Sequence, residues 1–353
     1  MSALQAAAPL GLTRPGYGLD GPLCLAALSL LGAGVVMVAS ASVAVAEKST
    51  GVPLYYFYKQ SGFAVLGLMM AAMLYAVPIR NWENTGFWLL TFAFLLLILV
   101  LIPGVGVKVN HARRWLDLGL FRLQASEPAR LAMVLYLVGY ATRRRGELQN
   151  SFKGLVKPLL PVVLACALLM LEPDFGATAL LLTVTLLVLF LAGARVSHLL
   201  VLAAAAGIGL TALVLTASYR LQRLMSFTDP FADIEKSGWQ LAQSLIAIGR
   251  GEWTGVGLGN SLQKLLYLPE THTDFLFAIW AEEFGLVGIG ILLAMFGLLV
   301  WRAFRIGRMA EDRGQLFSAN LCYAMGAWIG LQMLINLAVN MGLLPTKGLT
   351  LPL

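Results

Sequence analysis

Long runs of apolar residues separated by short polar segments dominate this chain. Nine runs reach or approach the roughly 20 residues that an α-helix needs to cross the hydrocarbon core of a membrane. Helices satisfy their own backbone hydrogen bonds, so they can span lipid. The pattern predicts an all-α polytopic integral membrane protein, folded as a single domain over residues 1–353. The predicted spans are residues 23–46, 60–78, 85–103, 127–142, 155–171, 175–193, 196–217, 275–301 and 317–344.

The longest polar stretch covers residues 218–273 and contains many glycines. A loop of this length seldom serves only as a connector, so we expect a large extracytoplasmic loop. Within it, apolar residues between Trp239 and Ile248 recur at helical spacing beside Gln240 and Gln243. This spacing predicts a short helix lying in the membrane interface, either as a cover for the bundle or in contact with a substrate.

Composition agrees with a membrane protein. Hydrophobic residues make up 59% of the chain and charged residues 12%, whereas a soluble domain carries about a quarter of its residues as charges. The three cysteines all fall inside apolar runs, so packing is expected for them rather than a disulfide or a metal site. The net charge of +7 comes without a basic face interleaved with aromatics, which favours anionic lipid over nucleic acid as a partner.

Lysine and arginine cluster after the fourth and eighth spans, which predicts that these ends and the N-terminus are cytoplasmic. The opposite side nevertheless carries a similar number of cations. We expect them to hold an anionic, phosphate-bearing ligand, because arginine matches the geometry of phosphate oxygens. The outer cations are Lys108, Arg113, Arg114, Arg122, Arg220, Arg223, Lys236, Arg250 and Lys264.

Residues 268–275 place two carboxylates and a histidine at the outer mouth of the eighth span. Asp274 is expected in the first turn of that helix, where the helix dipole favours its ionised form and makes it available as a base. The alternative is that Thr273 or Asp274 only caps the helix. Glu282 and Glu283 lie inside the same span and raise the idea of proton coupling.

A second group of charges opens the fourth span. Glu127 precedes Arg130 by three residues, on one helix face, so the two are expected to pair. The pair either neutralises itself within the membrane or lines a polar cavity reached from outside. Arg114 beside Trp115, and Lys347 near the end of the chain, either hold phosphate or extend to lipid head groups.

Segments spread along nearly the whole chain together resemble the SEDS family. They are Arg114-Trp115, Gln124–Arg130, Glu172–Thr178, Gly238–Gln240, Gly255–Gly259, Leu268–Phe275, Glu282–Gly285, and Asn336 with Gly342–Gly348. The chain resembles the cell-division branch more than the elongation branch, which usually carries lysine at the position of Arg130. The family continues into a tenth helix, which is expected beyond Leu353.

The resemblance implies a peptidoglycan glycosyltransferase that polymerises lipid II into septal glycan strands at the outer face of the bacterial cytoplasmic membrane. Asp274 matches the family's essential aspartate, which implies the general base of an inverting reaction. Help from Mg²⁺ or Mn²⁺ is implied too, without a recognisable ligand set, and no organic cofactor. Substrate-binding roles are predicted for Arg114, Glu127, Arg130, Gln240, Gln243, Lys264, Glu270, His272, Thr273 and Lys347.

The implied partners are lipid II, an FtsI-like class B penicillin-binding protein transpeptidase, and the division regulators FtsQ, FtsL, FtsB and FtsN. Two other functions stay open. A lipid II flippase needs a polar path through the bilayer and no catalytic base. A scaffold that activates a transpeptidase depends on lipid-facing helices and not on the Asp274 region.

Overall fold

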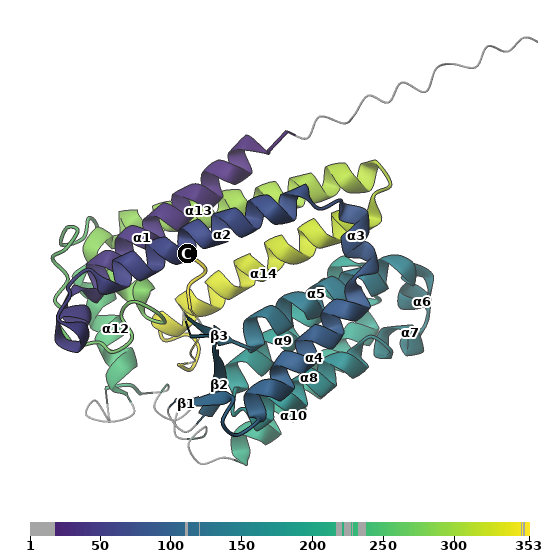
Figure 1. Ribbon diagram of the computed structural model, residues 1–353, viewed down its shortest axis with the longest axis horizontal. Coiled ribbons are helices and arrows are strands. Elements are labelled where there is room, and N and C mark those ends of the chain that lie inside the picture. The colour runs from purple at the N-terminus through teal and green to yellow at the C-terminus, as the bar shows by residue number, and fades with distance from the viewer. Residues whose placement is uncertain are drawn as a thin grey trace, which may run out of the picture.

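The computed structural model describes residues 18–109, 112–119, 121–216, 221, 227, 229–231, 238–346, 348 and 350–353. These residues form an elongated helical bundle with a small sheet near one end (Figure 1). Each predicted span is helical. The helices of these spans are α1 (Gly21–Thr50), α2 (Tyr55–Ala76), α4 (Gly86–Leu101), α5 (Ser126–Arg143), α7 (Phe152–Val156) followed by α8 (Leu159–Leu171), α9 (Phe175–Leu191), α10 (Val196–Leu215), α13 (Leu276–Asp312) and α14 (Leu316–Asn340). Shorter helices between them are α3 (Ile79–Asn84), α6 (Arg145–Asn150) and α12 (Trp239–Arg250).

Six stretches of the described residues are long and apolar enough to cross a membrane, namely α1, α2, Phe152–Leu171, α10, α13 and α14, and α4 and α9 are shorter apolar helices. Helix α2 has no buried residue, as expected for a helix that faces lipid. Helix α5 carries charges but is largely buried among α4, α9 and α14, so it does not need an apolar surface on every side. The predicted polytopic helical fold is confirmed.

Two apolar cores lie on either side of α14. The first is formed mainly by α4, α5, α8 and α9, and it takes Phe317 and Ala324 from α14. The second is formed mainly by α1 and α13, and it takes Met333 and Leu337 from α14. Helix α14 therefore joins the two halves of the bundle, as its central position shows (Figure 1).

A three-stranded antiparallel sheet follows α4 and was not predicted. Its strands are β1 (Gly106–Val109), β2 (Ala112–Asp117) and β3 (Arg122–Gln124), paired in the order β1-β2-β3. Trp115 pairs with Val107 on one side and with Gln124 on the other. Leu116 is buried in the first core, which fixes β2 against the bundle and positions Arg114.

The two predicted cytoplasmic cation clusters meet at one end of the bundle. Arg195 at the start of α10 donates to Asn150 at the end of α6, and Leu191 of α9 lines a pocket with Arg305 and Arg308 of α13. Figure 1 shows α6 and α7 at the end opposite α12 and the strands. The predicted shared side of the clusters is thus confirmed.

Candidate active site

Asp274 lies in the segment between α12 and α13, two residues before α13 begins at Leu276. It precedes the helix instead of occupying the first turn as predicted, and no side chain caps α13. The main-chain carbonyl of Asp274 accepts hydrogen bonds from Asn336 Nδ2 at 3.0 Å and from Asn340 Nδ2 at 3.1 Å. The chain after α14 returns to this point, because a Cβ added at Gly348 would lie 3.4 Å from Asp274 Oδ2.

The electrostatic surroundings of Asp274 differ from the expected stabilisation of its anion. Burial, and then the nearby Glu270 carboxylate, raise the pKa of the Asp274 carboxyl to about 6. Removal of water penalises the charged form, and it outweighs a helix dipole that begins two residues later. A carboxylate with a pKa closer to neutrality is a stronger base than an ordinary aspartate and is still ionised at pH 7.

The residues before Asp274 form a tight polar turn. Thr273 Oγ1 donates to Glu270 Oε2 at 2.8 Å, and Thr271 Oγ1 donates to the buried carbonyl of Ala41 at 3.0 Å. The His272 ring stacks at an angle on Tyr56 with 4.5 Å between centroids. Burial lowers the pKa of His272, so the imidazole is neutral at pH 7. The predicted cluster of Glu270, His272, Thr273 and Asp274 is therefore brought together.

Two buried carboxylates of α13 anchor the loop that leads to Asp274. Glu283 Oε1 lies 2.9 Å from Lys264 Nζ and accepts from Ser40 Oγ of α1 at 2.8 Å. Glu282 Oε1 lies 2.9 Å from Arg250 Nη1. Both carboxylates are fully buried. Lys264 is thus committed to a buried ion pair and not exposed for phosphate, and we do not retain it as a substrate ligand.

A distortion in α13 makes this anchoring possible. Gly285 has φ 63° and ψ −161° inside the helix, which only glycine adopts readily. At this distortion Val256 N donates to Glu282 O and Gly257 N donates to Glu283 O, each at 3.0 Å. The segment Gly255–Gly259 is a turn against α13, as predicted. Residues 251–265 are therefore pinned to α13 by main-chain bonds as well as by ion pairs.

A second polar group lies where β2 meets the turn between α8 and α9. Arg114 Nε lies 3.7 Å from Asp174 Oδ2, and its guanidinium also donates to the carbonyls of Glu172 and Pro173. Asp174 caps α9 through a 3.1 Å hydrogen bond from Ala177 N. Glu172 is almost fully buried, and burial followed by the charge of Asp174 raises its pKa to about 8. Arg114 is thus paired with the Asp174 carboxylate and hydrogen-bonded to two main-chain carbonyls.

The predicted pair of Glu127 and Arg130 is present. Arg130 Nη2 lies 3.1 Å from Glu127 Oε1, and the Arg130 guanidinium stands 5.6 Å from the centre of the Trp328 ring on α14. Arg130 is 2% exposed, whereas the Glu127 side chain is 48% exposed. The pair neutralises Arg130 and leaves Glu127 reachable, so both alternatives for this pair agree with the geometry.

Helix α12 confirms the predicted short helix within the large loop. It packs on α13 and α14, and Ser244 Oγ donates to the carbonyl of Asn340 at 2.8 Å. Gln243 is buried beside Ser244, and Gln240 is half-buried one turn earlier. Helix α12 therefore braces the end of α14 that holds Asp274.

The described residues do not test the predicted roles of some cations, and they offer no ligand set for the predicted metal ion. Lys347 and the predicted outer cations Arg220, Arg223 and Lys236 lie outside the described residues. Among those described, no group of three or more His, Cys, Asp or Glu side chains could hold a metal ion. The expected Mg²⁺ or Mn²⁺ therefore lacks a fitting protein ligand set in the described part of the chain, and the steps proposed below use protein groups.

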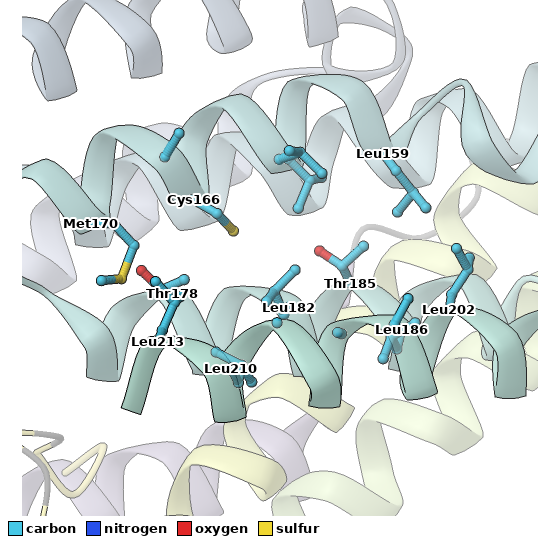
Figure 2. A pocket seen from close by; sticks show the side chains of 16 residues that line it. Leu159, Cys166, Met170, Thr178, Leu182, Thr185, Leu186, Leu202, Leu210 and Leu213 are labelled. Carbon is cyan, nitrogen blue, oxygen red and sulfur yellow. The ribbon is translucent and has the colours of Figure 1, made fainter. Parts of the chain in front are cut away.

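An apolar pocket of about 680 Å³ lies between α8, α9 and α10. Figure 2 shows Met170, Thr178 and Leu213 at one end of it and Leu159 and Leu202 at the other. None of the described residues that line it carries a charge. The pocket suits hydrocarbon and lacks the groups that acid–base chemistry needs.

The sequence does not predict a role for Asn340, and it places Asn336 only within a family motif. The pairing of Arg250 with Glu282 was also not foreseen. Arg250 and Glu282 are 32 positions apart, so no spacing rule links them. Two asparagines four residues apart on an otherwise apolar helix end were the available signal for Asn336 and Asn340.

Comparison with known proteins shows which family the chain matches. The family model FtsW/RodA/SpoVE, described as "Cell cycle protein", matches residues 22–353. A "Probable peptidoglycan glycosyltransferase FtsW" of Thioalkalivibrio sulfidiphilus is 53% identical over 335 residues, covering 95% of this chain and 84% of the relative. The FtsW of Nitrosococcus halophilus, named in the same way, is 54% identical over 328 residues, covering 93% of this chain and 84% of the relative.

Two solved structures share the fold. One, described as "Structural coordination of polymerization and crosslinking by a peptidoglycan synthase complex", has a TM-score of 0.76 at 28% identity, and the match covers 94% of this chain and 90% of that one. The rod shape determining protein RodA of Thermus thermophilus has a TM-score of 0.67 at 28% identity, over 94% of this chain and 88% of that one.

Proposed function

Because this chain belongs to the FtsW/RodA/SpoVE family, we propose that it is a peptidoglycan glycosyltransferase that polymerises lipid II, with Asp274 as the general base. The observation that carries the proposal is the state of Asp274, a partly buried carboxyl with a pKa raised to about 6 and a main chain fixed between α13 and α14. Relatives about half identical to the chain are named probable peptidoglycan glycosyltransferases, which supports the same reaction class.

In the proposed reaction, the 4-hydroxyl of the lipid II N-acetylglucosamine attacks C1 of the N-acetylmuramic acid at the end of the growing strand. The new C–O bond forms as the bond from C1 to the diphosphate oxygen breaks, so undecaprenyl diphosphate leaves with the bonding electron pair. The Asp274 carboxylate takes the hydroxyl proton. Attack on the face opposite the leaving group inverts the anomeric carbon.

The neighbouring residues have proposed roles in placing the substrate. Glu270, held by Thr273, keeps the pKa of Asp274 high, and the neutral His272 can donate or accept a hydrogen bond with a sugar. The pair of Glu127 and Arg130, together with Arg114, offers further polar contacts. Gln240 and Gln243 are proposed contacts from α12. A leaving diphosphate requires positive charge and hydrogen-bond donors, and of these side chains Arg114 is a cation with 35% of its side chain exposed.

We also propose that the chain works in the cytoplasmic membrane at the division septum, with its N-terminus inside and Asp274 outside. Its proposed partners are an FtsI-like class B penicillin-binding protein and the regulators FtsQ, FtsL, FtsB and FtsN. The support is the FtsW name of its relatives and the likeness to a chain of a synthase complex described as coordinating polymerization and crosslinking.

Purified chain in liposomes, given labelled lipid II and a class B penicillin-binding protein whose transpeptidase site is blocked, separates the three functions. A polymerase yields glycan strands. A flippase moves lipid II across the bilayer without forming strands, and a scaffold does neither. The proposal is wrong if the chain and the penicillin-binding protein together form no more glycan strands than the penicillin-binding protein forms alone.

A further inference from the structure

The carbonyl oxygen of Asp274 does not accept a main-chain hydrogen bond from the first turn of α13. The first main-chain donors of that helix, Ala278 N and Ile279 N, both bond to the carbonyl of Phe275, at 3.0 and 3.4 Å. In a regular helix start, the carbonyl of Asp274 would accept from Ala278 N. Two side-chain amides of α14 take that place instead, Asn336 Nδ2 and Asn340 Nδ2.

Asn340 is suited to hold this carbonyl. It is fully buried at the last residue of α14, and its amide nitrogen also lies 2.9 Å from the carbonyl of Asn336. The main-chain carbonyl of Asn340 accepts from the buried Ser244 Oγ of α12 at 2.8 Å. Ser244 therefore holds the main chain of Asn340, and the carbonyl of Asn336 orients its side-chain amide, so the amide nitrogen is presented to Asp274 in one geometry.

We propose that Asn340, assisted by Asn336, is a positioning residue for the reaction, which acts by fixing the main chain of Asp274 so that its carboxylate meets the attacking hydroxyl. This inference rests on the proposed function of Asp274 as the base. Asn340 does not touch the reacting atoms. The main-chain carbonyl of Asp274 accepts no helical hydrogen bond, so the side-chain amides of Asn336 and Asn340 hold it. Without these amides the main chain of Asp274 moves, and its carboxylate moves with it.

The Asn340→Ala variant tests this role. We expect the turnover rate of lipid II polymerisation to fall about 10- to 100-fold, as for displacement of a catalytic group by about 1 Å, with the KM for lipid II changed less than about twofold. A released carboxylate gains water, so its pKa falls. The acidic limb of the pH profile therefore moves to lower pH, which loss of folding alone does not produce.

Asn320→Ala is the matched control, because Asn320 lies on the same helix and its amide lies 3.5 Å from Thr142 Oγ1. It should keep the rate and the pH profile of the wild type. Asn336→Ala removes the second amide and should give a smaller fall with the same direction of the pH shift. It keeps the test decisive if Asn340→Ala does not fold.

Non-additivity gives the second measurement. If Asn340 acts through the Asp274 carboxylate, adding Asn340→Ala to Asp274→Asn leaves the residual rate unchanged, whereas two independent effects multiply. The positioning role is wrong if Asn340→Ala leaves the acidic limb of the pH profile where it lies in the wild type. It is also wrong if Asn340→Ala lowers the rate of Asp274→Asn by the same factor as it lowers the wild-type rate. Wild-type activity in Asp274→Asn alone overturns the proposed base, so the two failures are distinct.

Discussion

The proton affinity of Asp274 is set by what surrounds it. Partial burial and the adjacent Glu270 carboxylate raise its pKa to about 6, so it is a base above this pH and a neutral acid below it. The rate of polymerisation should therefore fall as the pH decreases through about 6, by about tenfold per unit well below it.

Glu270→Gln removes one of the two causes of this raised pKa. The pKa of Asp274 then falls, and the acidic limb of the pH profile of polymerisation moves to lower pH. The measurement is the initial rate of strand formation between pH 4.5 and 8 for both proteins. Glu252→Gln, an exposed carboxylate in the same loop, should leave the limb in place. If the acidic limb does not move in Glu270→Gln, Glu270 does not raise the pKa of Asp274.

The buried ion pair between Lys264 and Glu283 is a second feature at the level of single residues. Lys264→Met leaves a fully buried carboxylate without its cation, which should destabilise the protein by about 3 to 5 kcal/mol. Lys264→Met with Glu283→Gln should recover most of that loss. Thermal unfolding in detergent measures both.

Arg308→Met is the control for this pair, because its ion pair with Asp312 is mostly exposed and contributes little. Equal stability of wild type and Lys264→Met would mean that the ammonium does not neutralise Glu283. Lys264 would then again be available to a phosphate.

At the scale of elements, the distortion of α13 at Gly285 lets the loop before Asp274 pack against this helix. An added Cβ at Gly285 would lie 2.4 Å from Gly255 N and 2.6 Å from Gly251 O. Gly285→Ala should therefore destabilise the protein by at least about 2 kcal/mol through both clash and a positive φ, and it should reduce polymerisation strongly.

Gly290→Ala lies on the same helix with open space around the new Cβ, and it should be neutral or slightly stabilising. Thermal unfolding and polymerisation of the two alanine variants form the comparison. Equal behaviour of both variants would contradict the role given to the distortion.

All nine spans could be predicted because a helix that crosses lipid needs a long run of apolar residues, and such a run is visible in the sequence itself. The three strands between α4 and α5 were missed because they are only 3 to 6 residues long and their pairing depends on a fold-back. The predicted span starts at residue 275, within one residue of the start of α13 at Leu276, but Asp274 was expected inside the first turn and instead lies before the helix, which changed its predicted electrostatics. Propensity rules do not resolve a boundary at that precision.

The outer cations show the same limit within the site. Sequence suggested that they are present for an anionic ligand. Arg250, Lys264 and Arg114 instead lie beside Glu282, Glu283 and Asp174. These three partners are brought together by the fold and not by spacing, so the pairing of these three cations could not be predicted from the sequence.

At the scale of the whole molecule, α14 joins two halves with separate cores, while α13 presents apolar side chains such as Val287 and Ile291 to its surroundings. We predict that the transpeptidase partner contacts α13, α14 or the large outer loop. Photocrosslinkers at Val287 and Ile291 should capture it, whereas those at Leu200 and Ile208 of α10 should not. Crosslinks confined to other helices would refute this interface.

The most direct test compares wild type with Asp274→Asn in polymerisation of labelled lipid II, each purified with its penicillin-binding partner and matched for thermal unfolding. The substitution keeps the size of the side chain and the main-chain carbonyl that Asn336 and Asn340 hold, and removes only the base. We expect lipid II still to bind while glycan strands are lost. Unchanged strand formation would contradict the account and reopen transport as the function.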